Sequence, residues 1–516
     1  MPRFSAAAGS GSAPVVAGVD IATSAVRVLC VDAEGTVRGE GGAQLPPPVR
    51  DERGRSEQDA RAWWPAAAAA LRRATAQLPC GGGEVRAVAV SATSGTIVLA
   101  DREGTPLCPA SMYDDRRAAE SNSRAQEAGR SRWGRLGLTV GPTAALGRVV
   151  WWAELAAAGP RAAGSAADRG LAETLSGRSA REVRVLHTPD LIGRALTGAD
   201  VPTDWSHALK TGYDPLAGEW PAEVLDAWGV PSSWLPEVRA PGTVAGRVSA
   251  AASAETGLPE GCPVRLGMTD GCAGQLATGA VRPGQFVGVL GTTYVLKGVT
   301  RELVTDPAGA FYSHRHPDGW WLPGGASNTG GEALSSVPAD SLRRLDDAAR
   351  AHGPASCVAY PLRRSGERFP FVAPDARGFT LGAPSDEVER HRAALEGVAF
   401  VERLAVERVR ALGIPVTGPL YAAGGGSRSE LWSRIRASVL GMPLRVAERA
   451  ETAFGAALLA ASGTLHGSLE EAAAAMAGPG RLVEPVAAER DAMAESYARF
   501  VTALRDRGWL SAGPER

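Results

Sequence analysis

The stretch Gly267-Met268-Thr269-Asp270-Gly271-Cys272-Ala273 is the most informative part of this sequence. It places one carboxylate, Asp270, in a turn of small residues between a mostly apolar run (Cys262 to Leu266) and a small-residue segment that predicts a helix. On local grounds alone, Asp270 fits a helix cap as well as a chemical role. Two hydroxyl-bearing hairpins favour chemistry: Ala22-Thr23-Ser24 opens the chain, and Gly291-Thr292-Thr293 follows within one element.

The bulk composition excludes several classes of protein. A chain of 516 residues is too long for one core, so we expect two domains. The formal net charge of -1 gives no basis for a nucleic-acid or anionic-membrane partner. The six cysteines show no CxxC pair, and neither a signal peptide nor a membrane-spanning run is evident. The composition therefore predicts a soluble protein of a reducing, cytoplasmic compartment.

The order of segments predicts a domain boundary near residues 256–262. The expected divisions are a disordered lead (1–14), an N-terminal domain (15–258), a C-terminal domain (259–480) and a helical tail (481–516). Ile21-Ala22-Thr23-Ser24 aligns with Leu290-Gly291-Thr292-Thr293, and both lie in apolar hairpins. This single short match is weak evidence for an internal duplication.

Several small-residue segments could hold phosphate groups. Phosphoryl transfer needs a phosphate cradle, a cation and a base, and a tight hairpin with hydroxyls, such as Thr292 and Thr293, supplies the cradle. Ala423-Gly424-Gly425-Gly426-Ser427-Arg428-Ser429 lies between an apolar strand and a helix, where a nucleotide can lie across the backbone. The tract from Gly324 to Gly331 is a second candidate. Ordinary hairpin threonines and an unliganded glycine turn remain open as alternatives.

Two charged positions are also candidates. Asp20 follows Ala17-Gly18-Val19 on an inward-facing apolar strand, where a carboxylate needs a partner. A Mg²⁺ ion held through water, a sugar hydroxyl or a neighbouring turn would each supply one. Asp115 and Arg117 fit either a solvated run of charges or a pair that faces a sugar.

Together these segments resemble the FGGY carbohydrate kinases, which belong to the actin–hexokinase–Hsp70 fold group. The resemblance covers Val16 to Leu465, and its segments occur in the family's order. They are Gly18-Val19-Asp20-Ile21-Ala22-Thr23-Ser24, Gly267-Met268-Thr269-Asp270, Leu290-Gly291-Thr292-Thr293, Gly366-Glu367-Arg368-Phe369-Pro370, Leu395-Glu396-Gly397-Val398-Ala399-Phe400 and Gly424 to Ser429.

Within that family the sequence looks most like the D-ribulose kinases. Ser91-Ala92-Thr93-Ser94 replaces the Gly-Gln-Met-His pattern of xylulose kinases. The segments from His207 to Pro215, from Tyr312 to Arg315 and from Gly324 to Gly331 carry the rest of this finer resemblance.

The resemblance implies an α/β fold of two actin/hexokinase-like (ribonuclease H-like) domains with a cleft between them. It implies ATP and Mg²⁺ as cofactors, a small ketose or polyol as substrate, and a monomer or homodimer. The matching positions assign Asp270 as the general base. Asp20, Ser24, Ala25, Val26, Arg27 and Thr93 then contact the sugar, Thr292, Thr293, Gly325, Gly424, Gly425, Gly426 and Ser427 contact ATP, and Asp20 holds Mg²⁺ through water.

The sequence departs from the family at two places. Ala22 stands where the family usually has glycine, which leaves the role of the first hairpin open. The run Asp114-Asp115-Arg116-Arg117 fits the general family pattern better than the ribulose branch. We therefore expect phosphorylation of D-ribulose at its 5-hydroxyl, with xylulose, ribitol or glycerol as alternative acceptors. A catalytically silent sugar- or ATP-binding regulator is the alternative of another class.

Overall fold

Two compact α/β units make up the fold. The computed structural model describes residues 13–162 and 165–510. The described parts of Met1–Arg130, Val140–Ala277 and Glu451–Met476 form the first unit, and those of Ser131–Thr139, Thr278–Ala450 and Ala477–Arg516 form the second. Of the lead expected over residues 1–14, all but the last two residues lie outside the described residues. No helix in the described ranges is long and apolar enough to cross a membrane.

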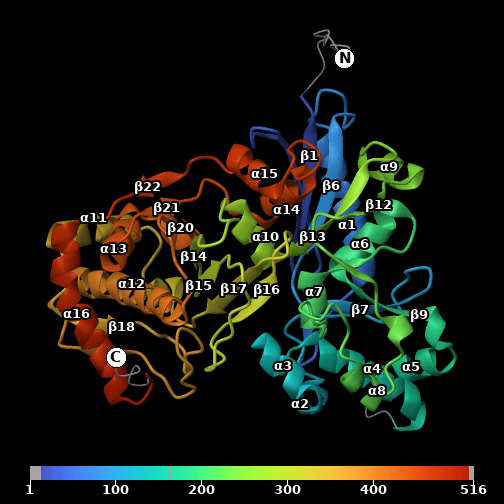
Figure 1. The fold of residues 1–516 in the computed structure, drawn as a ribbon, viewed down its shortest axis with the longest axis horizontal. Helices are drawn as coiled ribbons and strands as arrows, with labels where there is room; N and C mark the ends of the chain where they lie inside the picture. Colours follow the sequence, from blue (N-terminus) through green and yellow to red (C-terminus); the bar gives the residue numbers. More distant parts are fainter. Residues whose placement is uncertain (1–12, 163–164, 511–516) are drawn as a thin grey trace. The chain divides into compact units, whose positions relative to one another are not determined.

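A six-stranded sheet with the order β12-β13-β6-β1-β2-β3 forms the centre of the first unit (Figure 1). Its strands are β1 (Val15–Ile21), β2 (Ala25–Asp32), β3 (Val37–Gln44), β6 (Val85–Ala92), β12 (Val244–Arg247) and β13 (Pro263–Thr269). The neighbouring strands β1, β6 and β13 run parallel, whereas β2, β3 and β12 pair antiparallel. Because β1 is central and covered on both faces, all seven of its residues are buried.

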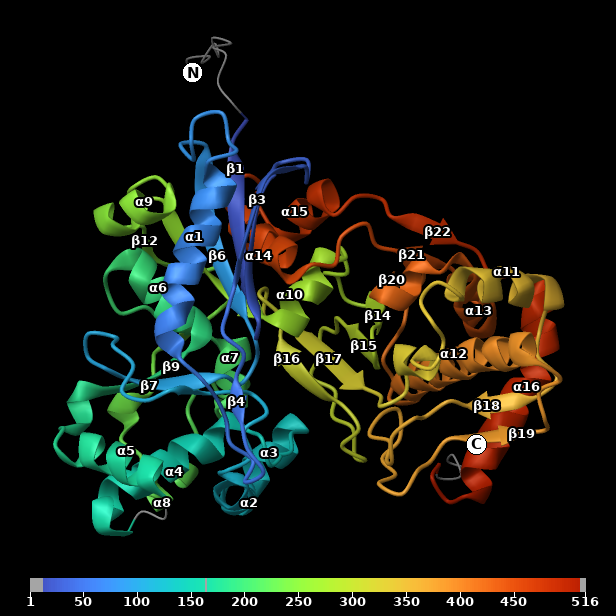
Figure 2. The same cartoon turned by 180° about the vertical axis from the view of Figure 1, so that it is seen from behind.

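Helices cover both faces of this sheet (Figure 2). The helix α1 (Trp63–Thr75) approaches β3 so closely that a Cβ on Gly41 would lie 1.9 Å from the carbonyl oxygen of Ala70. On the opposite face, α14 (Thr452–Ala461) approaches β1 at Gly18, where a Cβ would lie 1.9 Å from the carbonyl oxygen of Ala453. Every residue of α14 from Ala453 to Ala461 is buried. Glycine is required at these contacts because the helix backbone lies directly on the strand.

The remaining elements of the first unit surround this core. A second, five-stranded sheet has the order β4-β5-β8-β7-β9. Its strands are β4 (Val49–Arg50), β5 (Ser56–Gln58), β7 (Ile97–Asp101), β8 (Ala110–Ser111) and β9 (Val183–His187), and the short strands β10 (Thr203–Asp204) and β11 (Val238–Arg239) pair with each other. The helices are α2 (Ala119–Ala128), α4 (Ala145–Ala158), α5 (Ala166–Ser176), α6 (Thr188–Thr197), α7 (Trp205–Lys210), α8 (Ala222–Ala227), α9 (Ala250–Thr256), α10 (Asp270–Ala277) and α15 (Leu469–Met476). The helix α3 (Arg130–Leu136) crosses the division between the units.

The division between the units differs from the boundary expected near residues 256–262. The first unit extends to Ala277, because β13 pairs with β6 and α10 packs against α14. Asp270 therefore belongs to the first unit, although the sequence-based division placed it in the second domain. The segment 451–476 also returns to the first unit, which a division into two consecutive stretches could not anticipate.

A seven-stranded sheet with the order β16-β17-β15-β14-β20-β21-β22 forms the centre of the second unit. Its strands are β14 (Phe286–Leu290), β15 (Tyr294–Gly298), β16 (Tyr312–Arg315), β17 (Trp321–Ala326), β20 (Leu420–Ala423), β21 (Leu444–Val446) and β22 (Arg481–Val483). The strands β18 (Val358–Tyr360) and β19 (Phe379–Leu381) pair separately. The helices are α11 (Leu342–His352), α12 (Glu387–Ala411), α13 (Glu430–Leu440) and α16 (Ala487–Asp506), with the 3-10 helices η5 (Gly331–Leu334) and η6 (Gly425–Arg428).

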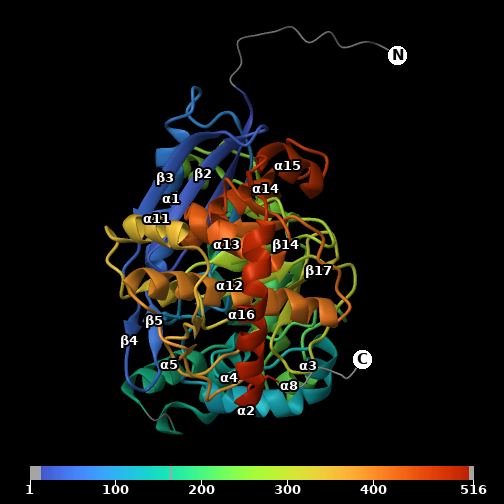
Figure 3. The same ribbon diagram turned by 90° about the vertical axis from the view of Figure 1, so that its left-hand side faces the viewer.

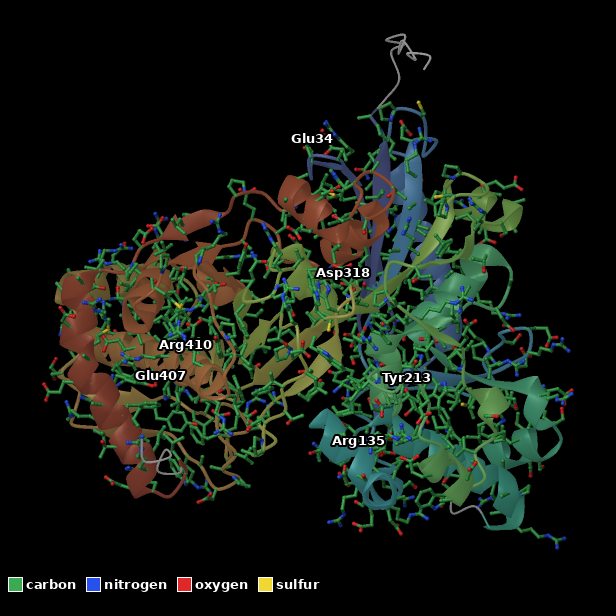
Figure 4. All side chains as sticks on the ribbon, viewed as in Figure 1. Glu34, Arg135, Tyr213, Asp318, Glu407 and Arg410 are labelled. Atoms are coloured by element: carbon green, nitrogen blue, oxygen red, sulfur yellow. The ribbon has the colours of Figure 1, made fainter. Side chains whose placement is uncertain are left out.

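The C-terminal helix α16 is part of the second unit's core. Figure 3 shows it crossing α12 and α13, and its residues Phe500 and Leu504 are fully buried. Phe500 packs on Phe400 of α12 with ring centroids 5.7 Å apart. On the labelled part of α12, the Glu407 carboxylate accepts a hydrogen bond from the Tyr497 hydroxyl of α16 (Figure 4). The segment expected as a tail after residue 480 is therefore integrated into this unit.

The two units repeat one strand order. In the first unit it is β3-β2-β1-β6-β13, and in the second it is β17-β15-β14-β20-β21. In each, an antiparallel hairpin (β1 with β2, β14 with β15) continues on its other side into parallel strands. The two hairpins aligned in the sequence therefore occupy equivalent positions in the two sheets.

Candidate functional site

Three parallel strands of the first unit end at the same edge of its sheet. Asp20 lies one residue before the end of β1 and pairs in register with Ser91 of β6, and Thr269 at the end of β13 pairs with Ala92. Ligands of α/β proteins bind at the carboxyl ends of parallel strands. This register brings the strand ends that carry Asp20, Thr93 and Asp270 to one place.

Asp20 is a buried carboxylate whose loss of water is only partly offset by neighbouring groups. It is 4% exposed, and its Oδ1 atom has no hydrogen-bond partner among the described residues. Its Oδ2 atom lies 3.9 Å from Nη1 of Arg27, which is opposite it on β2. Burial, together with the negative charge of Asp270, raises the pKa of Asp20 to about 7, and Arg27 opposes this only in part. A polar or cationic ligand at this carboxylate would remove the energetic penalty.

Asp270 is the first residue of α10 and is partly exposed. Its Oδ1 atom accepts a hydrogen bond of 2.7 Å from the backbone N–H of Gly271. A carboxylate at a helix N-terminus is stabilised by the helix dipole. This bond goes to the adjacent residue and engages only one of the two carboxylate oxygens.

The loop after β6 supplies two hydroxyls next to these carboxylates. The backbone N–H of Thr93 donates to the carbonyl of Ile21 at 3.2 Å, which ties this loop to β1. The Oγ atom of Ser94 is buried and has no hydrogen-bond partner in the part of the chain that the structure describes. An unsatisfied buried hydroxyl at a strand end can form a hydrogen bond with a polyhydroxy ligand.

The side chains of the first hairpin differ in how far they are exposed to a ligand. Ser24 and Arg27 are exposed, and Ala25 is partly exposed. Val26 is fully buried in the hydrophobic core, so its side chain does not face a ligand, contrary to its expected role in sugar contact. The side-chain alternation of β2 explains this, because Val26 points opposite to Ala25 and Arg27. Ala22 causes no backbone strain, since no described residue other than glycine has a positive φ.

Asp115 and Arg117 form a buried network and not a solvated run of charges. Asp115 is 1% exposed and accepts hydrogen bonds from the backbone N–H of Ser56 and from Nη2 of Arg117 at 2.7 Å. Glu57 also contacts Arg117, whose guanidinium lies 5.1 Å from the Trp151 ring centroid. Although burial favours the neutral form, the bonds and charges of the two carboxylates raise the pKa of Arg117.

Arg148 of α4 was not anticipated from the sequence. It is completely buried and donates to the carbonyl oxygens of Gly95, in the loop between β6 and β7, and of Ser111 and Met112, at the end of β8. Burial lowers its pKa to about 10. An arginine inside an apolar helix segment, Ala145–Ala158, was the signal that could have revealed it, because such a charge needs fixed partners.

The second unit contains a pocket of about 1010 Å³. Its residues come from the end of β14, from η5, α11 and η6, and from the start of α13. Thr292, Gly425 and Gly426, all predicted to contact ATP, line it. The apolar side chains of Leu290, Leu334 and Trp432 also line it, and glycines leave the backbone open, which suits a flat base and a chain of phosphates.

The glycine tract before η5 fixes the second hairpin. The N–H groups of Gly331 and Glu332 donate to the carbonyls of Gly291 and Thr292 at 2.8 and 2.9 Å. A Cβ on Gly330 would lie 2.4 Å from the carbonyl carbon of Thr293. The tract therefore packs directly against the hairpin turn, and Gly331 also lines the pocket.

Four other residues predicted to bind ATP do not line this pocket. Thr293 and Gly424 form the adjoining turns, where a Cβ on Gly424 would lie 2.5 Å from the carbonyl oxygen of Leu290. Gly325 is needed because a Cβ there would lie 2.4 Å from the Phe369 ring. The Ser427 hydroxyl donates to the carbonyl of Ala423 at 2.7 Å and accepts from the buried Arg436 at 2.9 Å.

The wall formed by α11 was not predicted. Asp346 of α11 lines the pocket and accepts hydrogen bonds from the hydroxyl of Ser429, the N-cap of α13, and from the ring of His391. Arg343 and Arg350 also line the pocket. The mixture of arginines and acids along this helix is typical of any solvent-exposed helix face, so the sequence carries no local signal for a pocket wall.

Metal-binding residues are few. No group of three or more His, Cys, Asp or Glu side chains that could hold a metal ion occurs within residues 13–162 and 165–510. The unpartnered Oδ1 atom of Asp20 fits Mg²⁺ held mainly through water and substrate phosphates, which is the usual mode for this ion.

Two family models match consecutive stretches of this chain. A family model described as the FGGY family of carbohydrate kinases, N-terminal domain, matches residues 15–277. The corresponding C-terminal domain model matches residues 284–464. The gap between the two matches coincides with the division between the structural units at residues 277 and 278.

Similar proteins and structures extend over nearly the whole chain. A xylulose kinase of Streptomyces rubiginosus is 33% identical over 87% of this chain and 88% of its own length. One of Streptomyces coelicolor is 32% identical over 89% and 90%. The crystal structure of a xylulose kinase from Rhodospirillum rubrum is 25% identical, with a TM-score of 0.81 over 95% of this chain and 98% of that chain.

Proposed function

This chain belongs to the FGGY family of carbohydrate kinases, and we propose that it transfers the γ-phosphoryl group of ATP to a ketopentose, with D-xylulose as the preferred acceptor. The choice of substrate is supported by the similarity of this chain to two proteins named xylulose kinases, which are 33% and 32% identical to it over nearly its full length. This replaces D-ribulose, which the finer sequence resemblance favoured, as the first candidate.

The two substrates use residues of different units. Asp20, Thr93 and Asp270 of the first unit would contact the sugar, and the pocket lined by Thr292, Gly425 and the walls of α11 and α13 would hold ATP. Leu290, Leu334 and Trp432 offer apolar contact to the base. The N–H groups of the second hairpin and of η6 suit phosphate oxygens.

Asp270 is the proposed general base. With Oδ1 held by the Gly271 N–H, the other oxygen would accept the proton of the sugar hydroxyl as that oxygen attacks the γ-phosphorus. The bond from the γ-phosphorus to the bridging oxygen of ADP breaks in the same step. Mg²⁺, when bound near Asp20, would neutralise charge on the phosphate oxygens.

D-Ribulose remains a second candidate because of Thr93 and Ser94. The unpartnered Ser94 hydroxyl and the partly exposed Thr93 provide small hydrogen-bonding groups at the end of β6. D-Xylulose and D-ribulose differ only in the configuration of one hydroxyl, and a site with few such contacts discriminates between them weakly.

A panel of acceptors tests the substrate. Sugar-dependent ADP release would be measured with D-xylulose, D-ribulose, ribitol, glycerol and gluconate. We expect the highest kcat/KM with D-xylulose. A higher value with D-ribulose would select the second candidate, and no turnover with any acceptor would contradict the proposed activity.

Replacing the base tests the mechanism. We expect Asp270→Asn to lower kcat at least ~10²-fold, because general-base catalysis contributes typically ~10²–10⁴-fold. Binding of sugar, measured by calorimetry, should change little. The matched control is Asp226→Asn, an exposed position of α8 in the same unit, which should retain full activity. Near-normal turnover of Asp270→Asn would remove Asp270 from this role.

A further inference from the structure

The short helix α7 and its N-cap contain three buried polar residues that lie beneath the sugar-side strand ends. Asp204 is 1% exposed, and Ser206 and His207 are fully buried. Asp204 caps α7 by accepting from the backbone N–H groups of Ser206 and His207. Neither family resemblance nor the mechanism above assigns these side chains a role.

Ser206 is bonded to the residue that precedes the proposed base. Its Oγ atom accepts a hydrogen bond of 2.9 Å from the backbone N–H of Thr269, the last residue of β13. The same hydroxyl donates its proton to Oδ1 of Asp204 at 2.5 Å. The direction of both bonds is thereby fixed, and Ser206 holds the backbone from which Asp270 begins α10.

His207 is bonded to the residue that precedes the proposed sugar-contact hydroxyls. Its Nε2 atom lies 3.2 Å from the carbonyl oxygen of Ala92, the last residue of β6, and its Nδ1 atom lies 2.5 Å from Oδ2 of Asp204. One carboxylate, Asp204, therefore joins the strand end before Thr93 to the strand end before Asp270. Each link consists of a single side chain.

Both partners of the His207 ring are hydrogen-bond acceptors. Asp204 receives three further donors at Oδ1, which marks it as an ionised carboxylate. The Ala92 carbonyl cannot donate. A neutral imidazole has only one N–H, so it would leave one of these contacts between two acceptors, whereas an imidazolium donates to both.

We propose that Asp204, Ser206 and protonated His207 form a positioning unit that sets the distance between the Thr93–Ser94 loop and Asp270, and so aligns the sugar hydroxyl with its base. The proposal rests on the proposed kinase function. None of the three side chains touches a reacting atom; each acts through a backbone group next to one that does.

The surroundings of His207 favour the protonated form of its ring. Although burial opposes it, the charge and hydrogen bond of Asp204 raise the pKa of His207 above its ordinary value of 6.5, and Asp190 of α6 contributes in the same direction. His187, at the end of β9, has its ring centroid 6.0 Å away. It makes its own contacts to Asp190, Thr203 and Thr211.

The far end of α7 is also anchored. Thr211, which caps the helix, is in contact with Nε2 of His187 at 2.9 Å. Tyr213, labelled in Figure 4, packs edge-on against Trp220 with ring centroids 5.2 Å apart. A helix held at both ends can transmit a defined position to the strands above it.

Ser206→Ala and His207→Gln test the proposal in the full-length protein. We expect each to lower kcat roughly ten- to hundredfold, because small misplacements of reacting groups have effects of this size. KM for ATP should change less than about threefold. The wild-type kcat should fall as the pH rises above the pKa of His207, and this alkaline limb should be absent from His207→Gln. His466→Gln is the matched control, because the Nε2 atom of His466 also contacts a backbone carbonyl, that of Ala33 at 2.9 Å, and lies outside this positioning unit. It should keep kcat within about threefold.

A second measurement separates positioning from activity. Hydrogen exchange at the Thr269 amide, followed without substrate, should accelerate at least about tenfold in Ser206→Ala and not in the control. Unchanged kcat and unchanged exchange in that variant would overturn the inference while leaving the kinase proposal intact. Wild-type protein that phosphorylates none of the acceptors would instead contradict the proposed function, even if the exchange result held.

Discussion

Asp20 is the residue whose environment departs furthest from that of a free side chain at this site. Its carboxylate is buried, one oxygen lacks a partner, and Asp270 adds a second negative charge. Such pairs of carboxylates are common where a cation or a phosphoryl group is handled. The sequence could predict that Asp20 needs a partner, because a charged residue follows three small or apolar ones. It could not predict the neighbour Asp270, which is far away in the chain.

Asp20→Asn should make the protein more stable at neutral and alkaline pH. The folded-state pKa of about 7 lies above the ordinary value of 3.8, so the folded protein binds the proton more tightly than the unfolded chain. The contribution of Asp20 to the free energy of unfolding is therefore fully present below pH 3.8 and is lost as the pH rises toward 7. The variant lacks this loss, and we expect a gain of about 1–4 kcal/mol at pH 8 without Mg²⁺.

Urea unfolding at intervals between pH 4 and pH 9 measures this difference. The gain should grow between pH 4 and 7 and then stay level. If the free energies of unfolding of wild type and variant differ by the same amount at every pH, the pKa of Asp20 is not raised in the folded protein. The exposed substitution Asp226→Asn serves as the control.

At the scale of elements, α14 and α10 decide where the proposed base lies. A Cβ on Gly455 of α14 would lie 1.9 Å from the carbonyl oxygen of Ala273 in α10. Gly18 makes an equally close contact between β1 and the same helix. The backbone of α10 is therefore seated against a helix that the sequence supplies about 180 residues later, from Thr452. No local pattern in the sequence predicts that α14 and α10 are partners, because the two helices lie far apart along the chain.

Gly455→Ala should reduce both stability and turnover. The added methyl group cannot be accommodated without moving α10, and overpacking of this kind costs about 1–3 kcal/mol. We expect a lower melting temperature and a lower kcat, since α10 begins with Asp270. Gly170→Ala in α5 is the control, because a Cβ there meets nothing within 4 Å. It should be neutral or stabilising by up to about 1 kcal/mol. Equal effects of the two substitutions would argue against this packing role.

The second hairpin and the glycine-rich loop show which ATP-contact residues can be predicted from sequence and which cannot. Thr292, Gly425 and Gly426 were predicted at the nucleotide site and do line the pocket. Ser427 was predicted there too, but its hydroxyl is bonded to Ala423 and Arg436. A glycine-rich loop predicts that a backbone is open to a ligand. Which of its side chains turns inward depends on long-range partners, here the buried Arg436–Glu402 pair.

At the scale of the whole molecule, two units repeat a strand order, and the proposed function gives each unit a different substrate. The first unit carries Asp20, Thr93 and Asp270, and the second carries the pocket proposed for ATP. Two domains were expected from the chain length, and the α/β fold of each was expected from the family resemblance. The assignment of residues 263–277 and 451–476 to the first unit was not expected, because it depends on strand pairing and helix packing between distant segments.

Because the pocket residues all belong to the second unit, nucleotide binding should be separable from sugar binding by one substitution. Gly425 lines the pocket, a Cβ there meets nothing within 4 Å, and its φ is not positive. Gly425→Ile should therefore fold normally while its side chain occupies space that ATP needs. We expect KM for ATP to rise at least about tenfold and KM for the sugar to stay within about threefold, since a lost pocket contact of 1–3 kcal/mol corresponds to a 10–200-fold change. The control Gly170→Ile has equally open surroundings on α5, so unchanged ATP affinity in Gly425→Ile, or an equal loss in both variants, would place the nucleotide elsewhere.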